Sequence, residues 1–150
     1  LLGRSPRTLK RFVNVYRLIR VGLSPYEREL FLSTSHGLAD YRSVLFLLAV
    51  DTGAPLAARP LFSTMRDLNN GIVVESESKS KQKVLAATFS NLILRMDGHS
   101  PASAGADWQR VRFWLDRQLK TESLPDDLSR CARWLARVGR FSFHTGRLDS

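Results

Sequence analysis

The sequence predicts an all-α protein, a compact bundle of about six to seven helices with a basic first helix against a buried central helix. Three observations favour this class. Apolar side chains recur at three- and four-residue spacing over most of the 150 residues. The pairs Ser5-Pro6 and Ser24-Pro25 are typical helix starts. The only β-branched run, residues 72–74, is too short to indicate a sheet.

The first predicted helix covers residues 6–21. Ser5 is a good N-cap, Pro6 fits the first helical position, and Gly22 is a plausible stop. One side of this helix is apolar and should face a core, through Leu9, Phe12, Val13, Tyr16 and Ile19. The other side is polar and carries Arg7, Lys10, Asn14 and Arg17.

Basic charge is concentrated at this end of the chain. The first 20 residues hold six of the 23 Lys and Arg and no acid, whereas the remaining 130 residues contribute only +3 of the net +9. Arg4 and Arg7 flank a helix N-terminus, where unpaired N–H groups and the helix dipole favour an anion. A phosphate partner would explain cations in that place. The alternative is a solvated basic face whose arginines pair with nearby carboxylates.

The segment Ser-Pro-Arg-Thr-Leu-Lys-Arg-Phe-Val-Asn, which begins at Ser5, resembles the opening of the helical lid in AAA+-related P-loop ATPases. It is most similar to the KAP-type P-loop NTPases. The sharp likeness covers residues 3–20, and a softer one covers 41–53 and 134–143. The resemblance implies that Arg7 is the sensor-2 arginine that reaches the γ-phosphate. Arg4 is then the second phosphate-binding candidate, and a supporting basic face comprises Lys10, Arg11, Asn14 and Arg17.

The resemblance also implies partners that this sequence lacks. ATP and Mg²⁺ would be held by an upstream nucleotide-binding domain of the same chain, because no Gly-x-x-x-x-Gly-Lys-Ser/Thr loop occurs here. We therefore expect no activity from this stretch alone and NTP hydrolysis when it is joined to such a core. The chain begins with Leu1, and we expect it to be a piece of a longer protein. KAP-like ATPases occur in bacterial defence and in membrane-associated systems. Self-association and a partner protein are both left open.

Two other functions fit the sequence. A free-standing module that binds nucleic acid through the first helix would need Arg7, Lys10 and Arg17 on open surface. A helical protein-interaction domain would instead show an exposed apolar patch, around Trp108 or Trp114. A pI near 10.6 favours an anionic partner without choosing between these readings.

The rest of the chain is predicted to be a single domain over 1–150, in which the basic helix at 1–23 precedes a helical core. Glu27 completes a capping box for a short helix, and a turn at 34–37 follows it. The run 44–50 leaves no polar face, so its helix should be the centre of the core. The helix that begins at Pro55 is read as one piece or as two around Pro60. The predicted segments are helices over 25–33, 38–52, 55–68 and 84–96, a core over 24–97, a loop over 98–106, and C-terminal helices over 107–150.

Polar residues shape the predictions for the end of the chain. Asp107 is expected to cap a helix over 108–119, and the acids of 125–127 are expected in the first turn of the last helix. That helix has an apolar stripe formed by Leu128, Cys131, Leu135 and Val138. Its other side carries Arg130, Arg133, Arg137 and Arg140, read as a solvated surface or as a phosphate site. The lysines Lys79, Lys81 and Lys83 are read as a solvated helix start or a nucleic-acid contact.

Several classes of site are disfavoured. Cys131 is the only cysteine, which rules out an internal disulfide and fits a reducing, cytoplasmic compartment. His36, His99 and His144 are widely separated and lack further ligands at metal spacing, so no metal site is expected. The longest apolar run has seven residues, against the ~20 that cross a bilayer, and no membrane segment is expected in this piece.

Overall fold

The computed structural model describes residues 5–33, 39–71, 86–99 and 102–141, and these residues form an all-α bundle as predicted. No strand occurs in these four ranges. The helices are α1 (Pro6–Val21), α2 (Pro25–Leu32), α3 (Tyr41–Gly53), α4 (Pro55–Asn69), α5 (Phe89–His99), the 3₁₀ turn η1 (Ala102–Ala104), α6 (Gly105–Lys120) and α7 (Ser129–Gly139).

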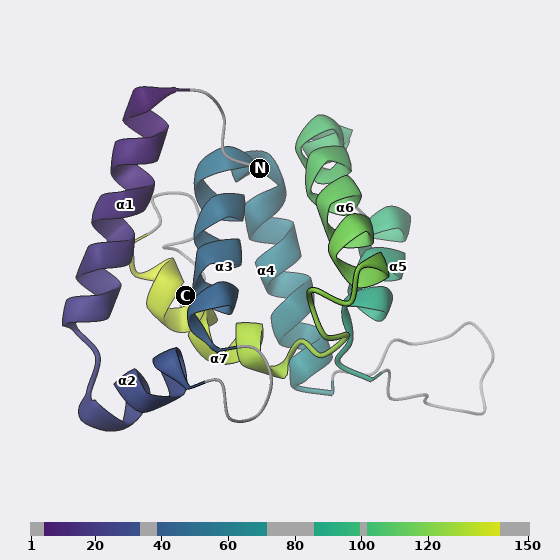
Figure 1. The fold of residues 1–150 in the computed structure, drawn as a ribbon. Coiled ribbons are helices and arrows are strands. Elements are labelled where there is room, and N and C mark those ends of the chain that lie inside the picture. Colours follow the sequence, from purple (N-terminus) through teal and green to yellow (C-terminus); the bar gives the residue numbers. More distant parts are fainter. Residues whose placement is uncertain (1–4, 34–38, 72–85, 100–101, 142–150) are drawn as a thin grey trace.

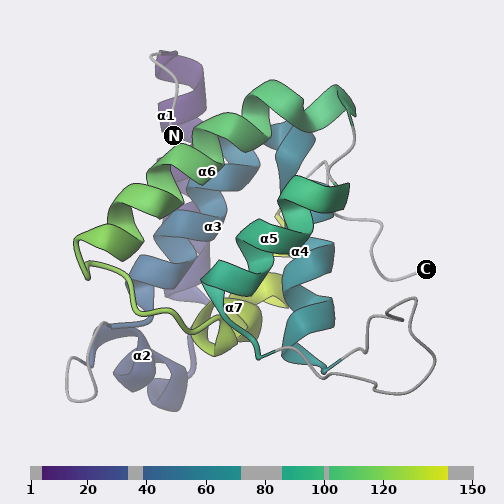
Figure 2. The same cartoon turned by 90° about the vertical axis from the view of Figure 1, so that its right-hand side faces the viewer.

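Two adjacent helices, α3 and α4, form the middle of the bundle (Figures 1 and 2). α1 packs along α3 on one side, whereas α5 and α6 pack against α4 on the other. α7 contacts both α3 and α4. The predicted packing of a basic first helix on a buried central helix is confirmed, since α3 is buried along most of its length. α4 shares the central position, because it packs against α3, α5, α6 and α7.

A local sequence signal explains the start of α2. The predicted capping box is present there: Ser24 N–H donates to Glu27 Oε2 at 2.8 Å, and Glu27 N–H donates to Ser24 Oγ at 3.3 Å. α4 is one continuous helix that contains Pro60. The segments 34–37 and 72–83, including Lys79, Lys81 and Lys83, lie outside the described residues.

An aromatic cluster around Phe31 ties α2 to the rest of the bundle. The Phe31 ring is 1% exposed and lies 6.0 Å from the ring of Tyr16, 6.2 Å from Tyr41 and 5.6 Å from Trp134. These neighbours come from α1, α3 and α7. Aromatic pairs at such separations add to the stabilisation from burial alone. A helix of only eight residues is thereby fixed by tertiary packing rather than by its own length.

The predicted loop over 98–106 is wrong for most of its length. α5 continues to His99, η1 covers Ala102–Ala104, and α6 begins at Gly105. Small residues and glycine predict a turn locally, but both helices continue because their apolar sides pack on α4. α5 also begins later than predicted, at Phe89, where Thr88 Oγ1 accepts a hydrogen bond from Asn91 N–H at 3.2 Å.

Asp107 does not cap α6, contrary to the prediction. It lies in the first turn of α6, is buried, and pairs with Arg110. Its Oδ2 accepts the N–H of Leu56 at 2.9 Å, one of the unpaired donors at the start of α4. The Asp107 carboxylate thus accepts a free N–H at the start of α4 instead of one at the start of α6.

The acids before α7 also act elsewhere than predicted. α7 begins at Ser129, so the acids of 125–127 precede the helix. Asp126 accepts the backbone N–H of Ser90 at 2.9 Å and its hydroxyl at 2.6 Å, in the first turn of α5. Asp127 accepts the N–H and hydroxyl of Ser129, both at 2.9 Å. Asp126 therefore joins the segment before α7 to the first turn of α5, 36 residues away in the chain.

The predicted core residues are largely confirmed. Leu128, Cys131 and Val138 are buried, and Leu135 packs against the core. In α1, however, Leu9 is 52% exposed, whereas Val15, which was not predicted to face the core, packs against it. Leu9 lies in the first turn of α1, and Figure 1 shows this end of the helix extending past the end of α3.

Candidate functional site

The predicted basic face exists on α1. At about 100° per residue, Arg7, Lys10, Asn14 and Arg17 fall within one side of the helix, and all four side chains are exposed. Within the described ranges, no acid pairs with Arg7, Lys10 or Arg17. Arg4 lies outside the described residues. The alternative in which these arginines pair with nearby carboxylates is therefore not what the described residues show.

Arg11 differs from its neighbours, because it turns toward the body. Its side chain is 33% exposed, and its Nη2 lies 3.8 Å from Asp51 Oδ2, on a carboxylate that α3 buries to 3% exposure. An exposed ion pair adds little to stability. Here, however, the cation offsets part of the cost of burying the Asp51 carboxylate. Arg11 thus anchors α1 on α3 and is not part of the open basic face.

Arg7 occupies the outermost turn of α1. Both views of the ribbon place this end of the helix beyond the ends of the neighbouring helices (Figures 1 and 2). The first turn contains no acid, and Ser5, although extended as an N-cap should be, makes no side-chain cap hydrogen bond. The N–H groups of this turn and the Arg7 guanidinium together form an electropositive tip that favours an anion.

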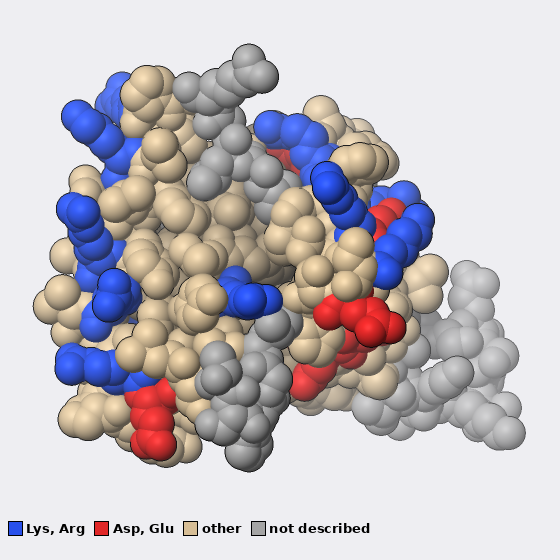
Figure 3. All heavy atoms as spheres, in the orientation of Figure 1, with Lys and Arg blue, Asp and Glu red and all other residues tan. Residues whose placement is uncertain are grey.

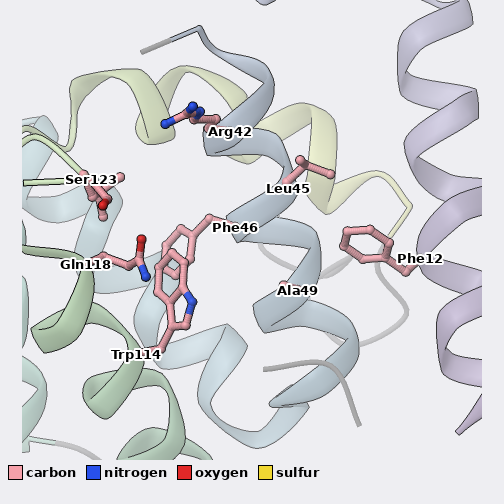
Figure 4. A pocket seen from close by; sticks show the side chains of 9 residues that line it. Phe12, Arg42, Leu45, Phe46, Ala49, Trp114, Gln118 and Ser123 are labelled. Carbon is pink, nitrogen blue, oxygen red and sulfur yellow. The ribbon is translucent and has the colours of Figure 1, made fainter. Parts of the chain in front are cut away.

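A groove beside this helix contains the apolar surface that the sequence suggested. It has a volume of about 580 Å³ and runs along α3 between α1 and α6. Figure 4 shows Phe12 at one wall and Trp114 at the other, with Leu45 and Ala49 between them. The Trp114 ring stacks on Phe46 with centroids 5.0 Å apart and an interplanar angle of 10°. Figure 3 shows Lys and Arg along the α1 side, and basic and acidic side chains together over the α5 and α6 side. The surface between them is mostly uncharged, with some basic atoms near its centre.

Only one of the two tryptophans named for an interaction surface contributes to it. Trp108 is 2% exposed, and its indole N–H donates to Asp97 Oδ1 at 2.8 Å. Trp114 is half-buried and lines the groove. At about 100° per residue, Trp108 lies about 20° around the helix from the buried Leu115, whereas Trp114 lies about 100° from it.

The arginine row of α7 serves the fold in two places. Arg133 Nη1 lies 3.3 Å from Asp40 Oδ2. Arg137 pairs with Glu27 and donates to the carbonyl oxygen of Gly22 at 2.9 Å. Both partners lie about a hundred residues away in the chain, at separations of 93 and 110. Neither a purely solvated row nor a phosphate site describes these two side chains.

Nucleophiles and metal ligands are scarce among the described residues. No group of three or more His, Cys, Asp or Glu in the described ranges is placed to hold a metal ion. The ring Nδ1 of His99 lies 3.3 Å from the Arg95 carbonyl oxygen, and His36 and His144 fall outside the description. Burial raises the pKa of the Cys131 thiol to about 12, which suppresses the reactive thiolate. None of the described helices is long and apolar enough to cross a membrane.

Comparison with known proteins adds no family. No family model matches the chain, and neither a curated protein nor a solved structure does so. The candidate site therefore depends on geometry and on the resemblance of the first helix. Sequence reasoning missed two features: the Phe46–Trp114 stack in the groove, and a second hollow that Arg20 and Arg28 line. No sequence signal links either pair, because each depends on how separate helices pack.

Proposed function

We propose that this chain is the helical lid and C-terminal region of a P-loop ATPase similar to the KAP type. In this proposal Arg7 contacts the phosphates of ATP, which an upstream nucleotide-binding domain of the same chain holds with Mg²⁺. The observation that carries the proposal is the position of Arg7: it is exposed on the outermost turn of α1, with no ion pair among the described residues. In the sequence resemblance, Arg7 corresponds to the sensor-2 arginine of the lid segment.

The chemistry of the side chain suits this role. A phosphoryl group that is being transferred carries charge on several oxygens, and catalysis stabilises it with preorganised cations and N–H donors. The planar guanidinium binds two oxygens at once and stays charged at all working pH values. A cation at a helix N-terminus opposes the dipole of the free helix. A bound phosphate reverses that penalty, because the dipole and the guanidinium then favour the same anion.

The attachment of α1 suggests how nucleotide state would reach the remaining helices. Phe12, Val15 and Tyr16 pack against the core, Ile19 is buried, and Arg11 pairs with Asp51. Movement of Arg7 toward a phosphate would therefore carry α1 and α3 with it. Closure on ATP and release after hydrolysis would move the bundle as one unit, in the manner of enzyme lids.

The experiment is ATP binding and turnover by the full-length natural chain. For Arg7→Ala we expect ATP binding within a few-fold of wild type and kcat lower by about 10²-fold, as for the loss of one donor to a developing oxyanion. Arg7→Lys should restore little, since the charge remains but the planar fork is lost. Arg117→Ala is the matched control, because Arg117 is an exposed arginine on α6, in a different part of the bundle. Unchanged turnover in Arg7→Ala, or a full-length chain that binds no ATP, would show the proposal to be wrong.

A second candidate function is nucleic-acid binding, which is favoured because Arg7, Lys10 and Arg17 share one open face. A binder of this kind should lose affinity with salt, with a log–log slope of about 0.9 per phosphate neutralised. It should also depend on Arg17 as much as on Arg7. A lid arginine, in contrast, affects turnover through Arg7 and leaves Arg17→Ala near wild type. Oligonucleotide titration at several salt concentrations distinguishes the two functions.

A further inference from the structure

A second concave surface lies where the end of α1 meets α2, and we name it the α1–α2 hollow. Its volume is about 410 Å³. Three arginines surround it, and apolar side chains form its floor and part of its wall. Its lining includes Arg17, Arg20, Arg28, Val21, Leu32 and Phe31.

The charge of the hollow has one sign. None of its lining residues is acidic. Within the described ranges, Arg17, Arg20 and Arg28 form no ion pair, although Arg20 lies 6.0 Å from the centroid of the Tyr16 ring. The acids of α2 are directed elsewhere: Glu27 pairs with Arg137, and Glu29 is exposed and does not line the hollow. Three like charges around one hollow repel each other, and an anionic partner relieves that repulsion.

The apolar part of the hollow is unusually open. Val21 is 82% exposed and Leu32 is 56% exposed, and Leu18, one turn back on α1, is 56% exposed as well. Exposed apolar residues that lie together mark interaction surfaces more often than single ones do. Beneath them the buried ring of Phe31 packs on three other aromatic rings. The hollow therefore has a fixed floor and does not need to rearrange on binding.

These features together select the kind of partner. A small anion would pair with the arginines but leave Val21 and Leu32 in water. A nucleic acid could pair its phosphates with the arginines, but its bases could not stack on Phe31, which is 1% exposed. A segment that carries both carboxylates and apolar side chains matches both parts of the surface. A helix can present apolar side chains on one face and carboxylates on its flanks, so a helix in the groove is the recognition mode that fits both parts of the surface.

We infer that the α1–α2 hollow docks an acidic amphipathic helix of a partner protein. Apolar side chains of that helix cover Val21 and Leu32, and flanking carboxylates pair with Arg17 and Arg28. Arginine forks bind carboxylates bidentately, which fixes the orientation of the helix as well as its affinity. This inference does not depend on ATP. Arg17 lies about 15 Å along α1 from Arg7, at a rise of roughly 1.5 Å per residue.

The probe is a fluorescein-labelled peptide of about 18 residues, with Leu at i, i+3, i+4 and i+7 and Glu on the flanks of that stripe. Fluorescence anisotropy should show saturable binding to the chain. Arg17→Glu/Arg28→Glu should weaken binding about tenfold or more. Val21→Gln/Leu32→Gln, which leaves net charge unchanged, should weaken it by a similar factor. All four side chains are exposed, and circular dichroism should show unchanged helicity.

Matched controls separate docking from general attraction to a basic protein. Arg117→Glu/Lys120→Glu removes the same charge from exposed positions on α6 and should bind the peptide as wild type does. A scrambled peptide of equal composition should bind at least tenfold more weakly. The inference is overturned if the scrambled peptide binds as well, or if the α6 variant loses as much affinity. Absence of peptide binding overturns it too, whether or not an oligonucleotide or phosphatidylserine vesicles bind through the same arginines.

Discussion

The carboxylate of Asp40 offers a sharp test of how α7 is held on the bundle. It precedes α3, is 4% exposed, and accepts the indole N–H of Trp134 at 3.0 Å. Arg133 reaches the same oxygen at 3.3 Å, but its own side chain is 52% exposed. One acceptor therefore satisfies a buried donor and an exposed cation. The perturbations Asp40→Ala, Asp40→Asn and Arg133→Ala separate these two contributions.

The expected magnitudes follow from the burial of each partner. Asp40→Ala leaves the indole N–H of Trp134 without an acceptor in a buried site, which costs about 1–3 kcal/mol. Asp40→Asn keeps an oxygen for the indole and removes the cost of burying a charge. It loses only an ion pair to a half-exposed arginine, worth about 0–1 kcal/mol. We expect Asp40→Ala to lower the free energy of unfolding by about 2 kcal/mol. Asp40→Asn and Arg133→Ala should each lower it by at most about 1 kcal/mol.

Urea unfolding followed by circular dichroism measures these differences. The slope of the unfolding free energy with urea should be unchanged, so that the shift in midpoint reports stability alone. A loss of about 2 kcal/mol is readily measured against a total stability of about 5–15 kcal/mol. If Asp40→Asn is as harmful as Asp40→Ala, the ion pair and not the indole hydrogen bond holds α7, and the reasoning from burial is refuted.

Two further predictions concern ionisable groups. Burial raises the pKa of the Cys131 thiol to about 12, so an alkylating reagent at pH 8 should react with it only when the protein unfolds. The alkylation rate should therefore follow the unfolding equilibrium as urea increases. Alkylation at the rate of an exposed thiol would contradict this prediction. The backbone N–H of Ser24, with smaller contributions from the Ser24 hydroxyl and Arg137, holds the pKa of Glu27 below its ordinary value of 4.5. Its ionised form therefore stabilises the fold at pH values above 4.5, and this contribution is lost as pH falls through the lowered pKa. The stability difference between wild type and Glu27→Gln should shrink from pH 7 to pH 3, and a difference that stays constant would count against the ionised capping box.

The proposed sites differ from the structural arginines in one respect. Arg11, Arg133 and Arg137 each reach an acid on another element. Arg7 and Arg17, among the described residues, reach none. Composition cannot make this distinction, because all five residues are arginines on amphipathic helices. The distinction appears only once the helices are packed, and it is the reason that the two ends of α1 are assigned to partners.

Helix existence was predictable from the sequence because its causes are local. Ser24 and Glu27 form the expected capping box. Apolar spacing indicated α1, α4 and α6, although the caps expected from Ser5 and Asp107 do not form. Periodicity also identified the buried α3. Boundaries were less predictable where a helix end packs on a neighbour. The small residues around 98–106 favour a loop by themselves, yet α5, η1 and α6 together occupy most of that stretch.

Some features of the candidate site could likewise be predicted from the sequence, and others could not. The spacing of residues 6–21 was enough to predict that α1 is a helix with one basic side and that Arg7 lies in its first turn. These properties depend on spacing along one element. Packing between helices brings Arg11 to Asp51, places the Asp107 carboxylate at the N–H of Leu56, and forms the α1–α2 hollow. The physical reason is that a charge or an apolar side chain acquires its role from what lies opposite it, and the opposing residue is set by packing between helices distant in sequence.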